Sequence, residues 1–188
     1  MKKTLFAIAA LALVATACGQ KNKKTATDTP ESKVLVAYFS ATGTTETVAK
    51  QLAEVTSATL YEIKPEVKYT AEDLDWRNQE SRSSLEMKDK SSRPAITGKM
   101  NDIKKYDVIY VGFPIWWYTA PTIINTFLEK YDWTGKTIVL FATSGGSGFG
   151  KAAEGLKGSV AADTVIIEGR VFRGRASDED LRKISELA

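Results

Sequence analysis

Residues 34–48 have the sequence VLVAYFSATGTTETV, in which an apolar run, a loop rich in hydroxyl groups and a helical pattern follow one another. Continuous apolar residues from Val34 to Phe39 indicate a strand that is covered on both faces, as parallel strands are. The helical pattern begins after the loop, with Val48, Leu52 and Val55 at positions i, i+4 and i+7. This stretch therefore predicts the first strand–loop–helix unit of an α/β fold.

The loop between this strand and this helix is suited to holding an anion. Unpaired backbone N–H groups and the positive end of the helix dipole lie at such a junction, and Gly43 permits a tight turn. The loop contains no Lys or Arg, so it predicts a neutral site that holds a phosphate monoester by hydrogen bonds. The alternative is a threonine-rich helix cap that binds no ligand. The hydroxyl groups available as donors belong to Ser40, Thr42, Thr44 and Thr45.

Apolar strand-like segments alternate with helical patterns along the rest of the chain. This alternation implies a parallel sheet with right-handed crossovers and helices on both faces. In the segment 65–100 the pattern is weak, and we expect one or two surface helices within 70–89. Ser177, followed by three acidic residues, predicts the start of the last helix. The further strands are expected at 58–64, 108–113, 137–142 and 165–167, the last with an irregular continuation to 172, and the further helices near 123–131, 151–156 and 178–187.

Three of the predicted strands end in unusual loops, and in such sheets ligands bind beyond the carboxyl ends of the strands. The first loop carries hydroxyl groups, the second (114–118) is aromatic, and the third (143–148) is rich in Gly and Ser. Trp116 and Trp117 could be core residues, and the third loop could be only a flexible connector. Together, however, the loops predict one site with a phosphate seat, an aromatic wall and a bare backbone that can approach a flat ring.

The three loops resemble those of the flavodoxin-like FMN-binding family, specifically the branch with a PIWW loop. The similarity extends from Val34 to Ala188, and its motifs are SATGTTE at 40–46, GFPIWW at 112–117 and TSGGSG at 143–148. The resemblance implies a doubly wound, five-stranded parallel sheet of strand order 2-1-3-4-5 in a three-layer αβα arrangement. It also implies non-covalent FMN as the cofactor.

The resemblance further implies which residues hold the cofactor. The FMN phosphate would contact Ser40 and the segment 42–45, and the isoalloxazine would lie between the second and third loops. The implied cofactor-binding residues are Ser40, Thr42, Gly43, Thr44, Thr45, Pro114, Ile115, Trp116, Trp117, Tyr118, Thr143, Ser144, Gly145, Gly146, Ser147 and Gly148.

Other catalytic constellations are excluded by composition. The segment 145–151 matches the GxxxxGK part of a nucleotide-binding P-loop, but Ala152 occupies the position of the hydroxyl residue that binds Mg²⁺. The chain has no His and one Cys, which excludes His-based triads and Cys/His metal sites.

The first 33 residues differ in composition from the rest of the chain. Lys2-Lys3 and the apolar run 5–14 predict a signal peptide over 1–17, and the residues ATA before Cys18 resemble a bacterial lipoprotein box. Cys18 is then the expected lipidation site, and 18–33 is a polar tether. The alternative is an ordinary signal peptide cut near Ala17. The predicted domain covers 34–188.

The charge of the predicted domain limits its partners. Residues 1–33 hold six of the 26 basic and two of the 23 acidic side chains, so the remainder carries 20 basic and 21 acidic ones. A nearly neutral domain has no excess of positive charge with which to bind nucleic acid. It also lacks the acidic surface expected of a small electron shuttle.

These observations and the resemblance together predict an FMN-dependent redox protein, held by a lipid anchor outside the cytoplasm in a bacterial cell envelope. It could pass electrons to a partner protein. It could instead be an NAD(P)H-dependent, quinone-type oxidoreductase, for which the near-neutral charge argues, or a flavin-binding lipoprotein without redox turnover. The only membrane contact expected is the lipid anchor.

Overall fold

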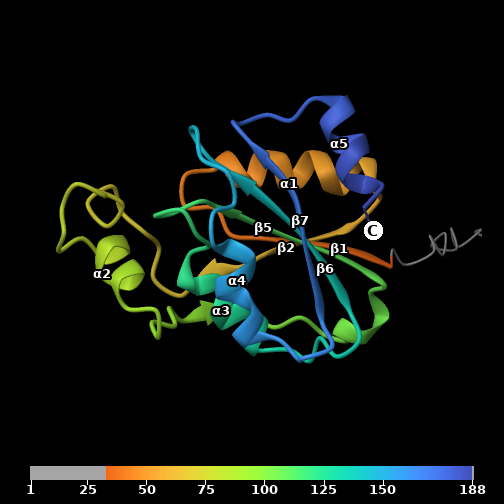
Figure 1. Cartoon of the computed structure of the whole chain (residues 1–188), viewed down its shortest axis with the longest axis horizontal. Helices are drawn as coiled ribbons and strands as arrows, with labels where there is room; N and C mark the ends of the chain where they lie inside the picture. The colour runs from red at the N-terminus through yellow and green to blue at the C-terminus, as the bar shows by residue number, and fades with distance from the viewer. Residues whose placement is uncertain (1–32, 188) are drawn as a thin grey trace, which may run out of the picture. The chain divides into compact units, whose positions relative to one another are not determined.

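In the computed structural model, which describes residues 33–187, five parallel strands form one sheet of order β2-β1-β5-β6-β7 (Figure 1). β3 and β4 pair with each other outside this sheet, so its order is the predicted 2-1-3-4-5. The doubly wound arrangement implied by the sequence is confirmed. The strands are β1 (Val34–Tyr38), β2 (Thr59–Glu62), β5 (Val108–Pro114), β6 (Thr137–Thr143) and β7 (Val165–Phe172).

Helices cover both faces of the sheet, which gives the expected three layers. Figure 1 shows α1 (Thr44–Val55) and α5 (Asp178–Ser185) on one side, and α3 (Thr122–Glu129) and α4 (Ala152–Leu156) on the other. The hydroxyl group of Ser177 caps α5 by accepting a hydrogen bond from the N–H of Asp180, at 3.2 Å, as its sequence predicts. Two 3₁₀ helices complete this part of the chain, η1 (Ile103–Lys105) and η2 (Lys157–Ser159).

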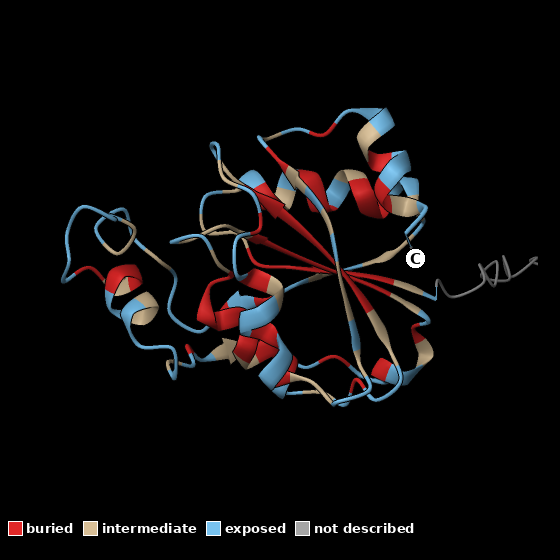
Figure 2. Cartoon of the chain, viewed as in Figure 1, coloured by how far each residue is buried: buried red, intermediate tan, exposed pale blue. Residues whose placement is uncertain are grey.

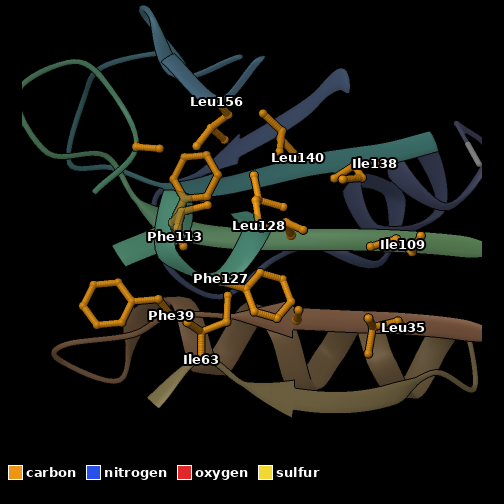
Figure 3. Close-up of a cluster of buried hydrophobic side chains, with 14 of the residues drawn as sticks. Leu35, Phe39, Ile63, Ile109, Phe113, Phe127, Leu128, Ile138, Leu140 and Leu156 are labelled. Atoms are coloured by element: carbon orange, nitrogen blue, oxygen red, sulfur yellow. The ribbon is translucent and has the colours of Figure 1, made fainter. Parts of the chain in front are cut away.

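The core consists of two apolar layers, one on each face of the sheet (Figure 2). Because successive side chains of a strand point to opposite faces, Leu35 and Phe39 contact the layer beneath α3, whereas Val36 contacts the layer beneath α1. Figure 3 shows the first layer, in which Phe127 of α3 lies close to the side chains of the sheet. The apolar runs of β1, β5 and β6 are therefore explained by burial on both faces.

β7 is irregular, as its sequence predicts. Its pairing with β6 shifts between Leu140 and Phe141, which pair with Glu168 and Arg170, so Gly169 is an extra residue. A Cβ atom at Gly169 would lie 2.6 Å from the carbonyl oxygen of Leu140, which explains the glycine there. β7 nevertheless continues to Phe172 and places the next residue at the carboxyl edge of the sheet.

The segment between β2 and β5 forms an insertion at one side of the sheet (Figure 1). It contains one helix, α2 (Arg82–Lys88), and the short antiparallel pair of β3 (Lys64–Pro65) and β4 (Ile96–Thr97). Of the one or two helices expected within 70–89, one is present.

In residues 33–187 the structure contains no helix of sufficient length and hydropathy to span a bilayer. The signal peptide predicted at 1–17, the lipidation site Cys18 and nearly all of the tether lie outside the described residues.

Candidate functional site

A cavity of about 750 Å³ lies at the carboxyl ends of β1, β5 and β6. The chain leaves β1 toward β2 on one side, whereas β5 lies on its other side, so this is the switch point at which doubly wound folds bind ligands. All three loops singled out from the sequence contribute to it. The cavity is lined by Ser40, Ala41, Thr42, Thr44, Thr45, Leu74, Trp76, Ser83, Pro114, Ile115, Trp116, Trp117, Tyr118, Thr143, Ser144, Gly145 and Arg173.

The loop after β1 is held in a shape that leaves the amino end of α1 open. Gly43 is the N-cap residue with φ +87°, and its N–H donates to the hydroxyl of Ser40 at 3.1 Å. The helix has no side-chain hydrogen bond at its N-cap, unlike the threonine cap considered as the alternative. Among the described residues, no acceptor takes the backbone N–H groups of Thr44, Thr45 and Glu46. These groups are free to bind an anion.

A buried pair of hydroxyl groups joins the first loop to the end of β6. The Oγ1 atoms of Thr45 and Thr143 lie 2.7 Å apart, and either can donate the hydrogen bond. The two residues are 1% and 4% exposed. The pair therefore fixes the first loop relative to the third, although 98 positions separate the two residues in the sequence.

The aromatic loop after β5 is a tight turn with an unusual backbone. The backbone groups of Trp116 and Thr119 exchange two hydrogen bonds, both of 3.0 Å. The two residues between them, Trp117 and Tyr118, have φ values of +46° and +61°. Left-handed conformations at both central positions define a type I′ turn, which usually contains Asn and Gly. The N–H of Lys151 holds the turn from behind by donating to the carbonyl oxygen of Tyr118 at 2.9 Å.

Trp116 is half-buried because two aromatic rings pack against it. Its ring is 5.7 Å from that of Phe39 and 5.5 Å from that of Tyr69, both edge to face. Tyr69 belongs to the insertion and donates from its hydroxyl to Glu86 at 2.6 Å, while the Arg82 guanidinium lies 3.9 Å from the centre of its ring. Burial, and then the bond to Glu86, raise the pKa of Tyr69 above its ordinary value. The insertion is thus anchored directly to the aromatic wall.

The Gly-rich loop after β6 enters the cavity only with its first residues. The hydroxyl of Ser144 accepts hydrogen bonds from the N–H groups of Gly146 and Ser147, at 3.2 and 3.0 Å. This compact turn directs the rest of the loop elsewhere. Gly146, Ser147 and Gly148 of the predicted site are therefore not in the lining, and Gly43 of the first loop is also outside it.

Five residues of the lining are not in the predicted set: Ala41, within the first loop, and four residues from other segments. Arg173 follows β7, whose last residue Phe172 accepts a hydrogen bond from the N–H of Ser144 at 2.9 Å. The first loop contains no cation, as predicted, but the cavity contains this one. Leu74, Trp76 and Ser83 come from the insertion, and the hydroxyl of Ser83 is buried without a hydrogen-bond partner in the described part of the chain. The position of Arg173 after a strand was the available signal.

Comparison with known proteins agrees with this geometry. The sequence model of the flavodoxin family matches residues 33–187, whereas no curated protein matches the chain. A candidate flavoprotein from Bacteroides eggerthii is 48% identical over 84% of this chain and 98% of its own, with a TM-score of 0.77. One from Bacteroides uniformis is 47% identical over 82% and 99%, with a TM-score of 0.74. A flavoprotein from Lactobacillus acidophilus, solved in complex with FMN, is 25% identical over 82% and 99%, with a TM-score of 0.61.

Proposed function

This chain belongs to the flavodoxin family, and from that premise we propose that it binds FMN without a covalent bond and transfers electrons through it. The observation that supports this most directly is the pairing of open N–H groups at the amino end of α1 with an aromatic wall in one cavity. The Lactobacillus relative in complex with FMN supports the same cofactor. The redox chemistry belongs to the flavin, and the protein supplies binding, orientation and access.

The residues of the cavity fit the two ends of FMN. The N–H groups of Thr44, Thr45 and Glu46, with the hydroxyls of Thr42 and Thr44, suit a phosphate group. Trp116 and Trp117 suit one side of a flat ring. Gly145 has no side chain and faces open space, so the ring can approach its backbone closely.

The decisive test compares FMN with riboflavin, which lacks the phosphate. We expect the unmodified protein to quench FMN fluorescence at far lower concentration than riboflavin fluorescence. Thr44→Val removes a hydroxyl that lines the cavity and should weaken FMN binding by about 1.5–3 kcal/mol, because the lost hydrogen bond is to a charged group. Riboflavin binding should not change. Equal affinities of the unmodified protein for the two flavins would refute the proposal.

Thr47→Val is the matched control for this experiment. Its hydroxyl lies on the same helix but donates to the carbonyl oxygen of Gly43 at 3.1 Å, and it does not line the cavity. The affinity for FMN should therefore stay within a factor of about two, as expected for exposed substitutions away from a site.

Arg173 is proposed to contribute a positive charge to the same phosphate. It is exposed and lines the cavity, so its effect should be screened by salt. Arg173→Gln should weaken FMN binding at low ionic strength and have little effect at high ionic strength, with riboflavin binding unchanged throughout. A loss that is independent of salt, or equal for both flavins, would show that the guanidinium does not act on the phosphate.

A second candidate function is an NAD(P)H-dependent, quinone-type oxidoreductase. The insertion favours it, because Leu74, Trp76 and Ser83 extend the wall of the cavity beyond the three flavin loops. A carrier that exchanges electrons with protein partners does not need such a wall. Steady-state oxidation of NADPH or NADH with a soluble quinone distinguishes the two roles. Absence of turnover, together with reversible reduction by a partner protein, identifies a carrier; absence of both indicates flavin binding without redox function.

We also propose that the protein is anchored to a bacterial membrane, outside the cytoplasm, through lipid on Cys18. The support is the sequence alone, with small residues directly before the one cysteine. Membrane fractionation of Cys18→Ser tests this. Release of the variant into the soluble fraction is expected, and unchanged membrane association would contradict the anchor.

A further inference from the structure

A second cavity, of about 540 Å³, lies beside the aromatic turn, and of its lining residues only Trp117 and Tyr118 also line the first cavity. It lies between α3, α4 and the segment that follows α2 (elements labelled in Figure 1). Nothing in the proposed electron transfer uses it. Its lining consists of Met87, Lys90, Arg93, Trp117, Tyr118, Thr119, Ala120, Thr122, Asn125, Lys151, Glu154, Gly155, Leu156, Gly158 and Ser159.

The inner part of this cavity contains an unsatisfied polar group. Thr122 is the first residue of α3 and is 6% exposed, and its hydroxyl has no hydrogen-bond partner among the described residues. Asn125, one turn further along the helix, donates from its amide to Gly155 and Ser159 at 3.0 and 2.9 Å. Thr122 and Asn125 therefore give the wall of the cavity beside α3 a polar character.

The cavity has an excess of positive charge. In the part of the chain that the structure describes, the side chains of Lys90 and Lys151 form no ion pair or hydrogen bond. Arg93 is already paired with Glu129, with Nε to carboxylate distances of 3.0 and 2.8 Å. Glu154 is the single carboxylate among the lining residues. A lining with two unpaired lysines and one carboxylate suits an anionic ligand.

The remaining side of the cavity is aromatic and is shared with the flavin site. Trp117 and Tyr118 line both cavities, and they are 44% and 72% exposed. Flat rings gain binding energy by packing against such side chains, and Met87 provides an adaptable apolar contact beside them.

From these three features we propose that the second cavity binds a small organic anion that carries a flat ring. The anionic group lies near Lys90 and Lys151, and the ring packs against Trp117 and Tyr118. Because the same turn borders the flavin cavity, the ligand sits beside the aromatic wall. This inference does not depend on FMN binding.

The test uses 2-naphthoate as the anion and 2-naphthalenemethanol as a neutral probe of matched size. Each is titrated into the full chain, with FMN added, and followed by ¹H–¹⁵N NMR. We expect 2-naphthoate to bind more tightly and to shift the signals of the Asn125 side-chain amide, Gly155 and Gly158, which belong to the second cavity. Shifts of Gly145, which lines the flavin cavity, or of Gly43, in the first loop, would instead indicate binding at the flavin site.

Charge variants test the assignment further. Lys90→Gln and Lys151→Gln should each weaken 2-naphthoate binding roughly fivefold, as expected for a partly exposed ion pair, and leave the neutral probe unaffected. Glu154→Gln should strengthen it. The control is Lys157→Gln, a lysine directly after α4 that lines neither cavity.

Three results would overturn the proposal. The first is equal binding of the two probes, and the second is a set of shifts confined to Gly43 and Gly145. The third is loss of 2-naphthoate binding when FMN is added, since the probe would then occupy the flavin site. If the protein fails to bind FMN, the shifts at Asn125 and the lysine variants still decide the question, so failure here is distinguishable from failure of the proposed function.

Discussion

Replacing Thr143 by Val removes one member of the buried hydroxyl pair that connects the first and third loops. The partner atom, Oγ1 of Thr45, now lies 2.7 Å from the Oγ1 of Thr143 and belongs to a residue that is 1% exposed. After the substitution it would be buried without a partner. Leaving a neutral hydroxyl in that state costs about 1–3 kcal/mol of unfolding free energy. In a chain of this length such a loss corresponds to a decrease of roughly 2–12 °C in Tm.

The double variant distinguishes this cause from a loss of packing. Val has nearly the shape of Thr, so replacing both Thr45 and Thr143 leaves no unpaired hydroxyl, and the pair is exchanged for an apolar contact. We expect the double variant to be less destabilised than either single variant. Its unfolding free energy should be lower than that of the unmodified protein by about 1 kcal/mol at most. The coupling energy of the cycle should then be about 1–3 kcal/mol. Urea unfolding of the FMN-free full chain provides these values.

Additive effects in this cycle would refute the reasoning, since they would show that the hydroxyl groups do not depend on each other in the folded state. A suitable control pair is Thr47→Val and Thr143→Val, because Thr47 bonds to the carbonyl oxygen of Gly43 instead. Those two substitutions should be additive within about 0.5 kcal/mol.

Two further predictions concern backbone space and pH. Gly150→Ala should lower Tm by several degrees and weaken FMN binding, because the new Cβ atom would lie 2.1 Å from the carbonyl oxygen of Tyr118. Gly146→Ala is the control, since a Cβ atom there would have no neighbour within 4 Å, and it should change neither Tm nor FMN binding. Burial, aided by the negative charges of Glu46 and Glu62, raises the pKa of Tyr38 from 10 to about 12. The folded state therefore binds the phenol proton more tightly than the unfolded state does. The stability that this proton provides is lost as the pH rises from 10 to 12. Between pH 9 and 11 the unmodified protein should lose about 1 kcal/mol more unfolding free energy than Tyr38→Phe, and equal losses would show that Tyr38 is not the cause.

Most of the sheet could be predicted from the sequence because its strands are buried on both faces. β1, β5 and β6 are continuous apolar runs, and such runs between helical patterns are typical of strands in a parallel sheet. The three loops follow these same strands, so their convergence is a consequence of parallel topology. For that reason, most of the predicted site residues line one cavity.

The parts that could not be predicted depend on contacts between distant segments. Arg173 follows β7, whose pairing with β6 includes a register shift at Gly169 that the sequence pattern did not locate. The insertion has few apolar residues, so its pattern gave no indication that Tyr69 packs against Trp116 or that Ser83 lines the cavity. Gly146, Ser147 and Gly148 of the third loop do not line the cavity, because the hydroxyl of Ser144 turns the loop back upon itself.

The aromatic turn shows how a strained loop without glycine can nevertheless be fixed in place. A non-glycine residue in the left-handed region costs about 1–3 kcal/mol, and Trp117 and Tyr118 both adopt it. Two contacts hold this conformation: the paired backbone bonds of Trp116 and Thr119, and the bond from Lys151 N–H to the Tyr118 carbonyl oxygen. The second contact requires the carbonyl oxygen to lie against Gly150, where no side chain could be accommodated. The strain is therefore balanced by a segment that lies behind the turn, beside the second cavity. A ligand in that cavity would contact Lys151, whose N–H helps to fix the position of the aromatic turn in the first cavity.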